Sequence, residues 1–274
     1  MRRVFLAFVV AFLAGQSVFA AQRILRPYQS PRAAAMGGVR LTTGTYDDCF
    51  FGNPARLTAN PAWRFSIIDG SAETNFATLS KFGDFLAGRD LVTSVASGAG
   101  ENLHMRGQTF MPAIYVPKVG GTGLSLAAAV FLSSQFDIDL RKSYILNASI
   151  VTDTGPVLGA AYAFLKDQSL SVGITLSGMY RFSADKDLTL NQLLQGQTFG
   201  PISDGREGAH FDVGLGVSYR LPKFLKDWDF EISAAGQNLV GGGYNHLPLR
   251  PFTGVGSPLV QRRSFGTGLA ARIG

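Results

Sequence analysis

Three segments in the second half of the chain alternate apolar with polar or small side chains for roughly eleven to thirteen residues: 170–182, 210–221 and 227–239. Successive side chains of a β-strand point to opposite faces, so each segment predicts a strand with one apolar and one polar or small face. Such strands are about twice as long as those of most soluble domains and can cross a tilted path through a bilayer.

Aromatic residues gather at the ends of these segments. One end carries Tyr180, Phe182 and Phe211, and the other carries Tyr219, Trp228 and Phe230. Two aromatic girdles around an apolar belt are typical of outer-membrane barrels. A soluble β-sandwich also alternates, but it favours shorter strands and gives no reason for aromatic residues at both ends. The pattern therefore favours an all-β fold, an antiparallel transmembrane β-barrel.

The first twenty residues are typical of a secretory signal peptide. Arg2-Arg3 supplies the positive charge, residues 4–14 are apolar, and Val18-Phe19-Ala20 places small residues at the cleavage site. The apolar run is broken at Gly15-Gln16-Ser17, which makes it too short for a membrane-spanning helix. We therefore expect residues 1–20 to be removed from an exported protein that resides in the bacterial outer membrane.

Composition excludes several classes of protein. The net charge of +6 is no nucleic-acid footprint, because no dense run of Lys and Arg interleaved with aromatic residues occurs. Only 16% of the residues are charged and 33 are glycine, which favours a β-rich protein whose surface is not all in water. The single cysteine, Cys49, cannot form an internal disulfide, and we expect it to be a small buried apolar residue.

Loop lengths orient the strands, because outer-membrane barrels place short turns in the periplasm and long loops outside. Residues 222–226 form a short turn, whereas 183–209 and 240–261 are long. About eight strands are then expected in a barrel domain 62–274, running alternately outward and inward: 62–75, 107–117, 121–138, 143–165, 170–182, 210–221, 227–239 and 262–274. Residues 76–105 become an external insertion, with a short amphipathic helix predicted from the spacing of Phe76, Leu79, Phe82, Phe85 and Leu86.

The strand predicted at 143–165 contains Gly155-Pro156. Proline removes a ladder donor, so this dipeptide predicts a bend or bulge and is the candidate strand kink. A hairpin turning at 152–156 is the alternative, but it would add a strand and break the alternation of directions.

The chain stops at Arg272-Ile273-Gly274, inside an alternating run and without the terminal aromatic residue common in bacterial barrels. Eight strands are close to the lower limit for a closed barrel, and so small a barrel leaves little channel. We therefore expect a C-terminally truncated version of a larger barrel rather than a small or open one.

Residues 32–57 contain a run of small residues with Met-Gly-Gly, an Asp-rich turn and Asn-Pro-Ala: Met36, Gly37, Gly38, Asp47, Asp48, Asn53, Pro54 and Ala55. This segment resembles the N-terminal motif of the long-chain fatty-acid transporter superfamily of outer-membrane barrels. Relatives in that superfamily serve type IX secretion and conjugal transfer. Arg56 intervenes before the apolar Leu57 and departs from the pattern, while Gly236-Gln237-Asn238-Leu239 resembles a strand-end motif of the shuttle-type relatives.

The same motif has a physical interpretation. Gly37-Gly38 permits a tight turn, Asp47 and Asp48 can cap a short helix, and Asn53-Pro54 favours the start of another turn. The resemblance implies that the N-terminal segment 21–61 folds into the barrel mouth from the periplasmic side as a plug. An ordinary linker before the first strand is the alternative.

Catalytic motifs are weak in this sequence. The histidines His104, His210 and His246 are scattered without metal-ligand spacing, and Gly-x-Ser-x-Gly does not occur. Gly241-Gly242-Gly243 lacks a following Lys-Ser/Thr and is expected to be a flexible loop. We expect a protein that is not an enzyme and that uses no cofactor or metal.

Two functions are compatible with these observations. The resemblance implies passive transport of hydrophobic small molecules, which enter a pocket, pass the plug and leave sideways through a strand kink, here Gly155-Pro156. The alternative is a non-transporting scaffold or shuttle for a secretion or conjugation system. Expected partners are outer-membrane lipid, a hydrophobic ligand and a secretion-system component, and not nucleic acid. A continuous apolar pocket would favour transport, and a filled interior would favour scaffolding.

Overall fold

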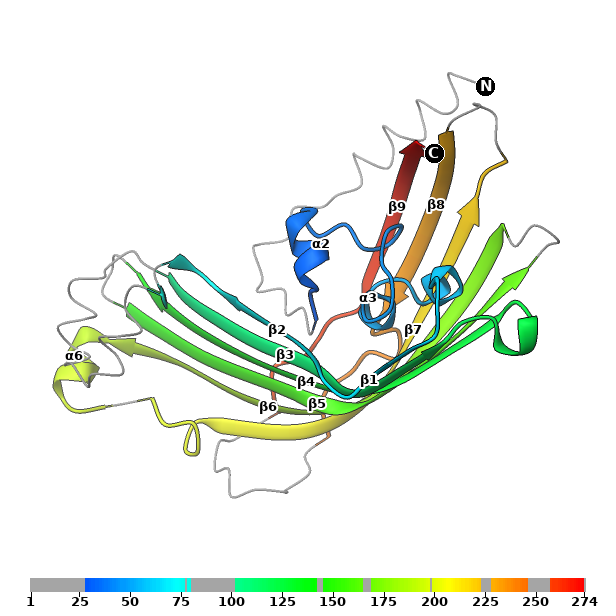
Figure 1. Cartoon of the computed structure of the whole chain (residues 1–274). Helices are drawn as coiled ribbons and strands as arrows, with labels where there is room; N and C mark the ends of the chain where they lie inside the picture. The colour runs from blue at the N-terminus through cyan, green and yellow to red at the C-terminus, as the bar shows by residue number, and fades with distance from the viewer. Residues whose placement is uncertain are drawn as a thin grey trace.

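A computed structural model of the chain describes residues 28–76, 78–79, 102–141, 145–164, 169–197, 199–222, 228–245 and 257–273. These residues form one antiparallel nine-stranded sheet, in the order β1-β3-β4-β5-β6-β7-β8-β9, with β2 also paired to β3 (Figure 1). The strands are β1 (Arg64–Ser66), β2 (Asp69–Thr74), β3 (Asn102–Val116), β4 (Leu124–Leu140), β5 (Ile145–Phe164), β6 (Leu170–Thr189), β7 (Gly205–Arg220), β8 (Trp228–Gln237) and β9 (Ser264–Ile273). The antiparallel all-β prediction is confirmed.

The sheet curves into a trough (Figure 1). Among the described residues, β9 pairs only with β8, and β1 and β2 pair only with β3, so the trough has two free edges. The helices are α2 (Pro31–Ala35), α3 (Asp48–Phe51), η1 (Pro54–Ala59), η2 (Val119–Gly121) and α6 (Leu190–Leu194). No helix in the described ranges is long and apolar enough to cross a membrane.

Several predicted boundaries were wrong. The strand expected at 62–75 is divided into β1 and β2 at Ile67-Ile68, where Ser66 Oγ donates to the Ile68 carbonyl at 3.0 Å. Strand β3 begins at Asn102, inside the expected external insertion, and β6 and β7 both extend into the expected loop 183–209. These extensions carry charged side chains, such as Arg206 of β7 and Asp185 of β6 at 3.7 Å, in place of apolar alternation, so the sequence pattern fades before the strand ends.

The predicted signal peptide and all but the start of the helix predicted in 76–105 lie outside the described residues.

Strand β5 is continuous through Gly155-Pro156, which rules out the alternative hairpin at 152–156. Pairing with β6 is interrupted between Thr154↔Tyr180 and Val157↔Ser177, and the register is the same on both sides. The dipeptide therefore makes a gap in the ladder and not a bulge. A Cβ at position 155 would lie 1.9 Å from the Gly178 carbonyl oxygen, so only glycine fits this approach of β5 to β6.

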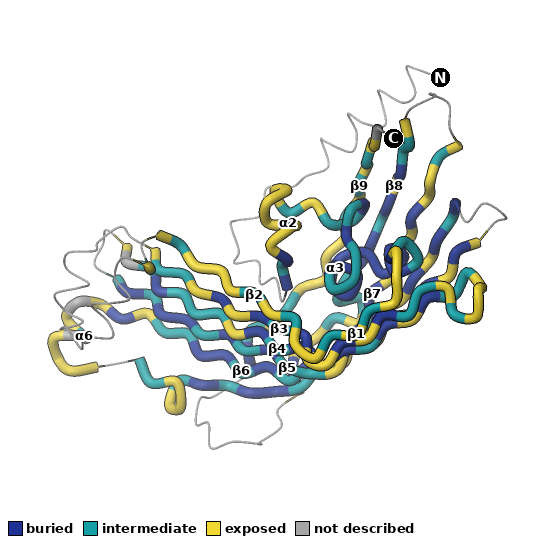
Figure 2. Tube along the Cα trace, viewed as in Figure 1, coloured by how far each residue is buried: buried dark blue, intermediate teal, exposed yellow. Residues whose placement is uncertain are grey.

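Burial across the sheet is inverted relative to a soluble protein. At the start of β6 the buried residues are small or polar, with Ser171 at 7% and Thr175 at 3% exposure, whereas Val172 and Ile174 between them are 43% and 38% exposed; further along the strand Met179 and Leu188 are buried. The same alternation runs along β7, where Leu215 and Val217 are exposed and Ser218 is buried (Figure 2). The convex face is therefore apolar and open here, and the concave face of β6 and β7 is polar or small and covered; toward β3, β4 and β5 the covered face carries aromatic side chains such as Phe110 and Phe131.

The N-terminal segment lies on the concave face (Figure 1). Ser30 begins α2 by accepting from Ala33 N at 3.0 Å, and Gly37 and Gly38, with φ of 68° and 89°, turn the chain after it. Asn53 begins η1 by accepting from Ala55 N at 3.1 Å, with Pro54 in the first helical position. The turns predicted at Gly37-Gly38 and Asn53-Pro54 are therefore confirmed.

Candidate functional site: the contact between the N-terminal plug and the sheet

We call residues 28–60 the plug and the concave face of the sheet the wall. The plug touches the wall along two sectors of different chemistry. Toward β3, β4 and β5 the contact is aromatic and apolar, and toward β6 to β9 it is polar. The candidate site therefore consists of an apolar sector and a polar sector.

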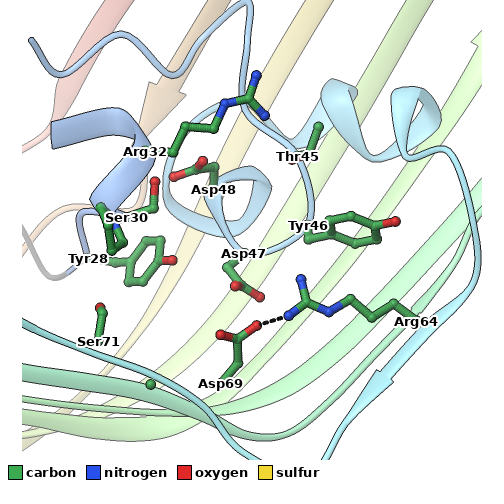
Figure 3. Close-up of a pocket in the computed structure, with 12 residues that line it drawn as sticks. Tyr28, Ser30, Arg32, Thr45, Tyr46, Asp47, Asp48, Arg64, Asp69 and Ser71 are labelled. Atoms are coloured by element: carbon green, nitrogen blue, oxygen red, sulfur yellow. Dashed lines mark hydrogen bonds and ion pairs between the residues drawn. The ribbon is translucent and has the colours of Figure 1, made fainter. Parts of the chain in front are cut away.

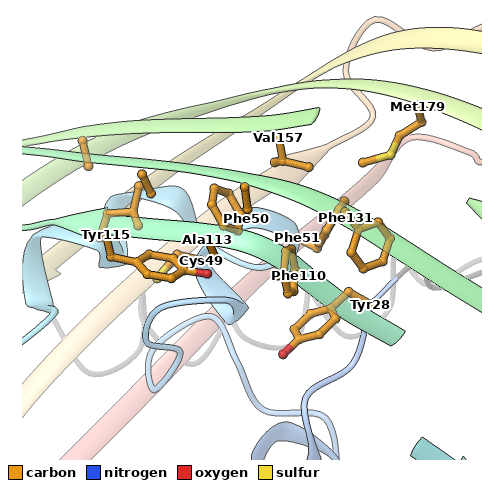
Figure 4. Close-up of a cluster of buried hydrophobic side chains, with 14 of the residues drawn as sticks. Tyr28, Cys49, Phe50, Phe51, Phe110, Ala113, Tyr115, Phe131, Val157 and Met179 are labelled. Atoms are coloured by element: carbon orange, nitrogen blue, oxygen red, sulfur yellow. The ribbon is translucent and has the colours of Figure 1, made fainter. Parts of the chain in front are cut away.

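The apolar sector is a cluster of rings (Figure 4). Phe51 of the plug lies 4.8 Å from Phe131 of β4, and Tyr28 lies 4.9 Å from Phe110 of β3, measured between ring centroids. Cys49 is in the same cluster and is 0% exposed, so its predicted burial is confirmed. Burial raises the pKa of its thiol, and a protonated, buried thiol is unreactive.

Glycines on the wall form the seat of the plug. A Cβ at Gly216 of β7 would lie 2.0 Å from Asn53 Oδ1, and one at Gly173 of β6 would lie 2.4 Å from the Pro54 carbonyl carbon. At Gly159 of β5 it would lie 2.8 Å from Leu57 Cδ1. The concave positions of three adjacent strands thus lack side chains where η1 approaches, which explains part of the high glycine content.

Asn53 connects the plug to the wall as well as starting η1. Its side chain is fully buried, and Nδ2 donates to the Leu41 carbonyl and to Ser218 Oγ, each at 3.0 Å. Gln237 of β8 donates to the Gly52 carbonyl at 2.7 Å, and Thr58 shares a hydrogen bond with Ser171 at 2.9 Å. Of the other predicted motif residues, Ala55 is fully buried, whereas Met36 is exposed at the end of α2.

Arg56 makes the strongest polar contact, and its role was not foreseen from the sequence. Its Nη1 lies 2.7 Å from Glu231 Oε1 of β8, with both side chains 7% exposed, and Arg272 of β9 lies 3.2 Å from Glu231 Oε2. A buried carboxylate needs such partners, because removing one leaves an uncompensated charge. In the sequence Arg56 was notable only as a departure from the motif that residues 32–57 resemble, and nothing in the sequence pointed to Glu231.

The predicted capping role of Asp47 was wrong. Asp47 occupies the position before α3, but its side chain makes no capping hydrogen bond; it accepts instead from Tyr115 Oη of β3. The competing partner is the buried phenol of Tyr115, and backbone carbonyls already accept from the first N–H groups of α3, as Tyr46 O does from Cys49 N at 3.0 Å. Asp48 is buried in the first turn of α3. Its pKa is raised, because desolvation outweighs the opposing effects of a hydrogen bond with Ser30 and the charge of Arg40.

A pocket of about 310 Å³ lies between these acidic residues and the edge of the sheet (Figure 3). Arg64 of β1 forms an ion pair with Asp69 of β2 within it. Burial raises the pKa of Asp47 to about 7; the charge of Asp69 acts in the same direction, and the Tyr115 hydrogen bond and Arg64 act against it. The pocket is lined by Tyr28, Ser30, Pro31, Arg32, Thr45, Tyr46, Asp47, Asp48, Arg64, Asp69, Gly70 and Ser71.

A second contact covers the wall toward the long loops. Arg181 of β6 pairs with Asp153 of β5 at 2.6 Å and donates to the Leu259 carbonyl at 2.7 Å, and its guanidinium lies 4.8 Å from the Tyr244 ring. Because Tyr244 and Leu259 belong to the connection between β8 and β9, this buried arginine holds that connection over the concave face. The sequence showed no sign of it.

The histidines considered in the sequence analysis do not lie close together. His104 Nδ1 lies 2.6 Å from Asp137 Oδ1, His210 packs 5.4 Å from the Tyr244 ring, and His246 lies outside the described residues. Within the described ranges no group of three His, Cys, Asp or Glu side chains could hold a metal ion.

Comparisons with protein-family models, with curated proteins and with solved structures gave no significant match to this chain.

Proposed function

We propose that the chain is an outer-membrane protein of the β-barrel type whose lumen is closed by its own N-terminal plug. The observation that carries this proposal is the inverted burial of the sheet. In water, exposing Leu158, Ile174 and Leu215 on one face while covering serines and threonines on the other would be unfavourable. In hydrocarbon the same arrangement is favourable, because lipid covers the apolar face and the plug satisfies the polar one.

Aromatic residues at the turn end of the sheet support this placement. Tyr162 and Phe164 at the end of β5 and Tyr219 at the end of β7 are exposed, and so is Trp228 at the start of β8. These side chains lie at one level across the sheet, where the bilayer interface favours amphipathic rings.

We further propose that the protein transports hydrophobic small molecules passively. Val157 and Met179 flank the gap between β5 and β6 and belong to the aromatic cluster under the plug. An apolar hollow of about 350 Å³ reaches to Leu158 and Leu176, the pair that follows Val157↔Ser177 along the ladder. The hollow is lined by Ile114, Val116, Leu126, Ala127, Ala128, Leu158, Gly159, Ala160, Ile174 and Leu176. Apolar surface thus lies on both sides of the same interruption in the wall, as sideways exit would need.

A scaffold without transport is the second candidate, and the polar sector favours it. Arg56 and Glu231 form a buried ion pair on the concave side, with the partly exposed Arg272 beside it. At the opposite edge of the sheet, near β1 and β2, the pocket between the plug and the wall is lined by aspartates and arginines among other residues. A lumen filled in this way is well suited to carry other proteins and poorly suited to pass an apolar ligand.

Fractionation of the full-length protein in a Gram-negative host tests the first proposal. The protein should sediment with outer membranes, resist extraction by urea and be released by detergent, since its convex face needs an apolar surrounding. Recovery of folded monomer from the periplasm without detergent would refute the proposal.

Flux of a hydrophobic fluorescent probe into proteoliposomes separates transport from scaffolding. Replacing Asn53-Pro54 by Ala-Ala removes the start of η1 and should increase flux while heat-dependent gel mobility stays native. Met36→Ala, an exposed plug residue, is the matched control and should leave flux unchanged. Equal flux through all three proteins with a native sheet would exclude gating by the plug and favour the scaffold.

A further inference from the structure

Two carboxyl groups, one from the plug and one from the sheet, meet at the pocket in Figure 3. Asp47 stands just before α3 and Asp69 begins β2, and their side chains point toward each other. Arg64 pairs with Asp69, and Tyr115 donates to Asp47. The contact between plug and β2 thus brings two acidic groups together beside one guanidinium.

Each element around Asp47 contributes a titratable or charged group. They are Tyr115 of β3, Asp69 of β2, Arg64 of β1, Tyr28 from the segment before α2, and Asp48 and Cys49 within α3. Arg32 of α2 also lines the pocket, and Arg64 is the cation that acts on Asp47. The Arg64 guanidinium lies 5.0 Å from the Tyr46 ring and pairs with Asp69, so one positive charge serves two carboxyl groups.

Hydrogen-bond capacity makes this contact depend on a proton. An ionised carboxylate only accepts, so with both groups ionised the facing oxygens repel each other. A proton on Asp47 turns one of its oxygens into a donor to Asp69, while the other still accepts from Tyr115. Carboxyl pairs that share one proton hold it to higher pH than isolated carboxyls do.

We propose that Asp47 and Asp69 form a proton-dependent contact that holds the plug against β2 when one proton is shared and loosens the plug when that proton is lost. The adjoining pocket of about 310 Å³ gives this proton a route to solvent. The proposal rests on the proposed function only in that a loosened plug is taken to open the lumen.

The direction of the pH effect follows from the raised pKa. The plug bound to the wall retains its proton more strongly than the released plug, so binding is strongest below the ordinary aspartate pKa of 3.8. It weakens as the pH rises from there toward about 7 and then levels off, because both states are then ionised.

Alkylation of Cys49 measures plug release directly. Cys49 is the one cysteine of the chain, follows Asp47 by two residues and is 0% exposed, so a maleimide reacts only when the plug opens. The folded full-length protein in detergent is compared with Asp47→Asn, which imitates the protonated group, at each pH between about 5 and about 8. The ratio of the wild-type rate to the Asp47→Asn rate cancels the titration of the thiol itself.

This ratio should rise about tenfold per pH unit in the lower part of the range and level off above about pH 7. Asp69→Asn should shift the rise to lower pH without abolishing it, because burial of Asp47 remains. Asp139→Asn, which removes an exposed carboxylate 3.7 Å from Arg141 at the far end of β4, should keep the wild-type profile.

The proposal is overturned if the ratio of the wild-type to the Asp47→Asn alkylation rate does not change with pH while gel mobility stays native. It is also overturned if Asp139→Asn alters the pH profile as much as Asp69→Asn does. If Asp47→Asn does not fold, the shift between wild type and Asp69→Asn decides the question, and its absence counts against the proposal. No membrane or flux measurement enters this test. Failure of the transport proposal would therefore leave its result unaffected.

Discussion

Replacing Gly216 by alanine adds one methyl group at the place where the plug approaches the wall most closely. The new Cβ would lie 2.0 Å from Asn53 Oδ1 and 2.8 Å from Pro54 Cδ, so η1 must move outward by more than an ångström. Overpacking of this kind typically costs about 1–3 kcal/mol. The cost falls on the closed state, so the open fraction should rise about 5- to 150-fold.

Cys49 alkylation at one fixed pH reads this change. Gly107→Ala on β3 is the matched control, because a Cβ there meets nothing within 4 Å. In the Gly216→Ala/Asn53→Ala double variant, truncating Asn53 removes its Oδ1 and makes room for the methyl group. Its alkylation rate should therefore increase less than the two single effects combined. An alkylation rate in Gly216→Ala no higher than in Gly107→Ala, with the sheet intact, would show that η1 does not bind the wall as described.

Three other substitutions test the remaining contacts. Arg56→Ala should accelerate Cys49 alkylation and lower the urea midpoint by an amount equivalent to about 3 kcal/mol, because the partly exposed Arg272 is then the remaining cation beside Glu231. Restoration of the midpoint in Arg56→Met/Glu231→Leu would confirm this cause, and an unchanged midpoint in Arg56→Ala would contradict it. Ile174→Arg on the convex face should destabilise the membrane-inserted protein by about 2–4 kcal/mol, whereas Leu194→Arg in exposed α6 should not, and equal effects would contradict the lipid-facing assignment. Asp153→Ala should leave Arg181 buried without its carboxylate and expose the connection between β8 and β9 to protease, and unchanged cleavage would show that the ion pair does not hold it.

The strands and the plug turns could be predicted because their causes are local. Period-two alternation reports burial on the two faces of a strand, and Asn53-Pro54 reports a helix start within three residues. Predicted boundaries were wrong where a strand continues with charged side chains, such as Asp185 and Arg206, after the apolar pattern has ended. The division at Ile67-Ile68 is likewise invisible in a run that alternates on both sides.

The contacts that hold the plug could not be predicted, because they join distant parts of the chain. Arg56 and Glu231 are 175 positions apart, and Asn53 and Ser218 are 165 apart. Charge and amide groups carry no periodic signal that pairs them. The sequence shows a high glycine content but not which glycines of the wall contact the plug. Their role can be recognised only when the segment that packs against them is known.

The two free edges of the trough have a consequence for how the sheet can enter a bilayer. Along β9 and along β1 and β2, every second residue turns its backbone N–H and C=O away from the paired neighbour. Hydrocarbon offers these groups no partner, and each unsatisfied one costs several kcal/mol. For the proposed outer-membrane protein, insertion would therefore be coupled to strand addition, because other strands would have to complete the hydrogen bonding of these two edges.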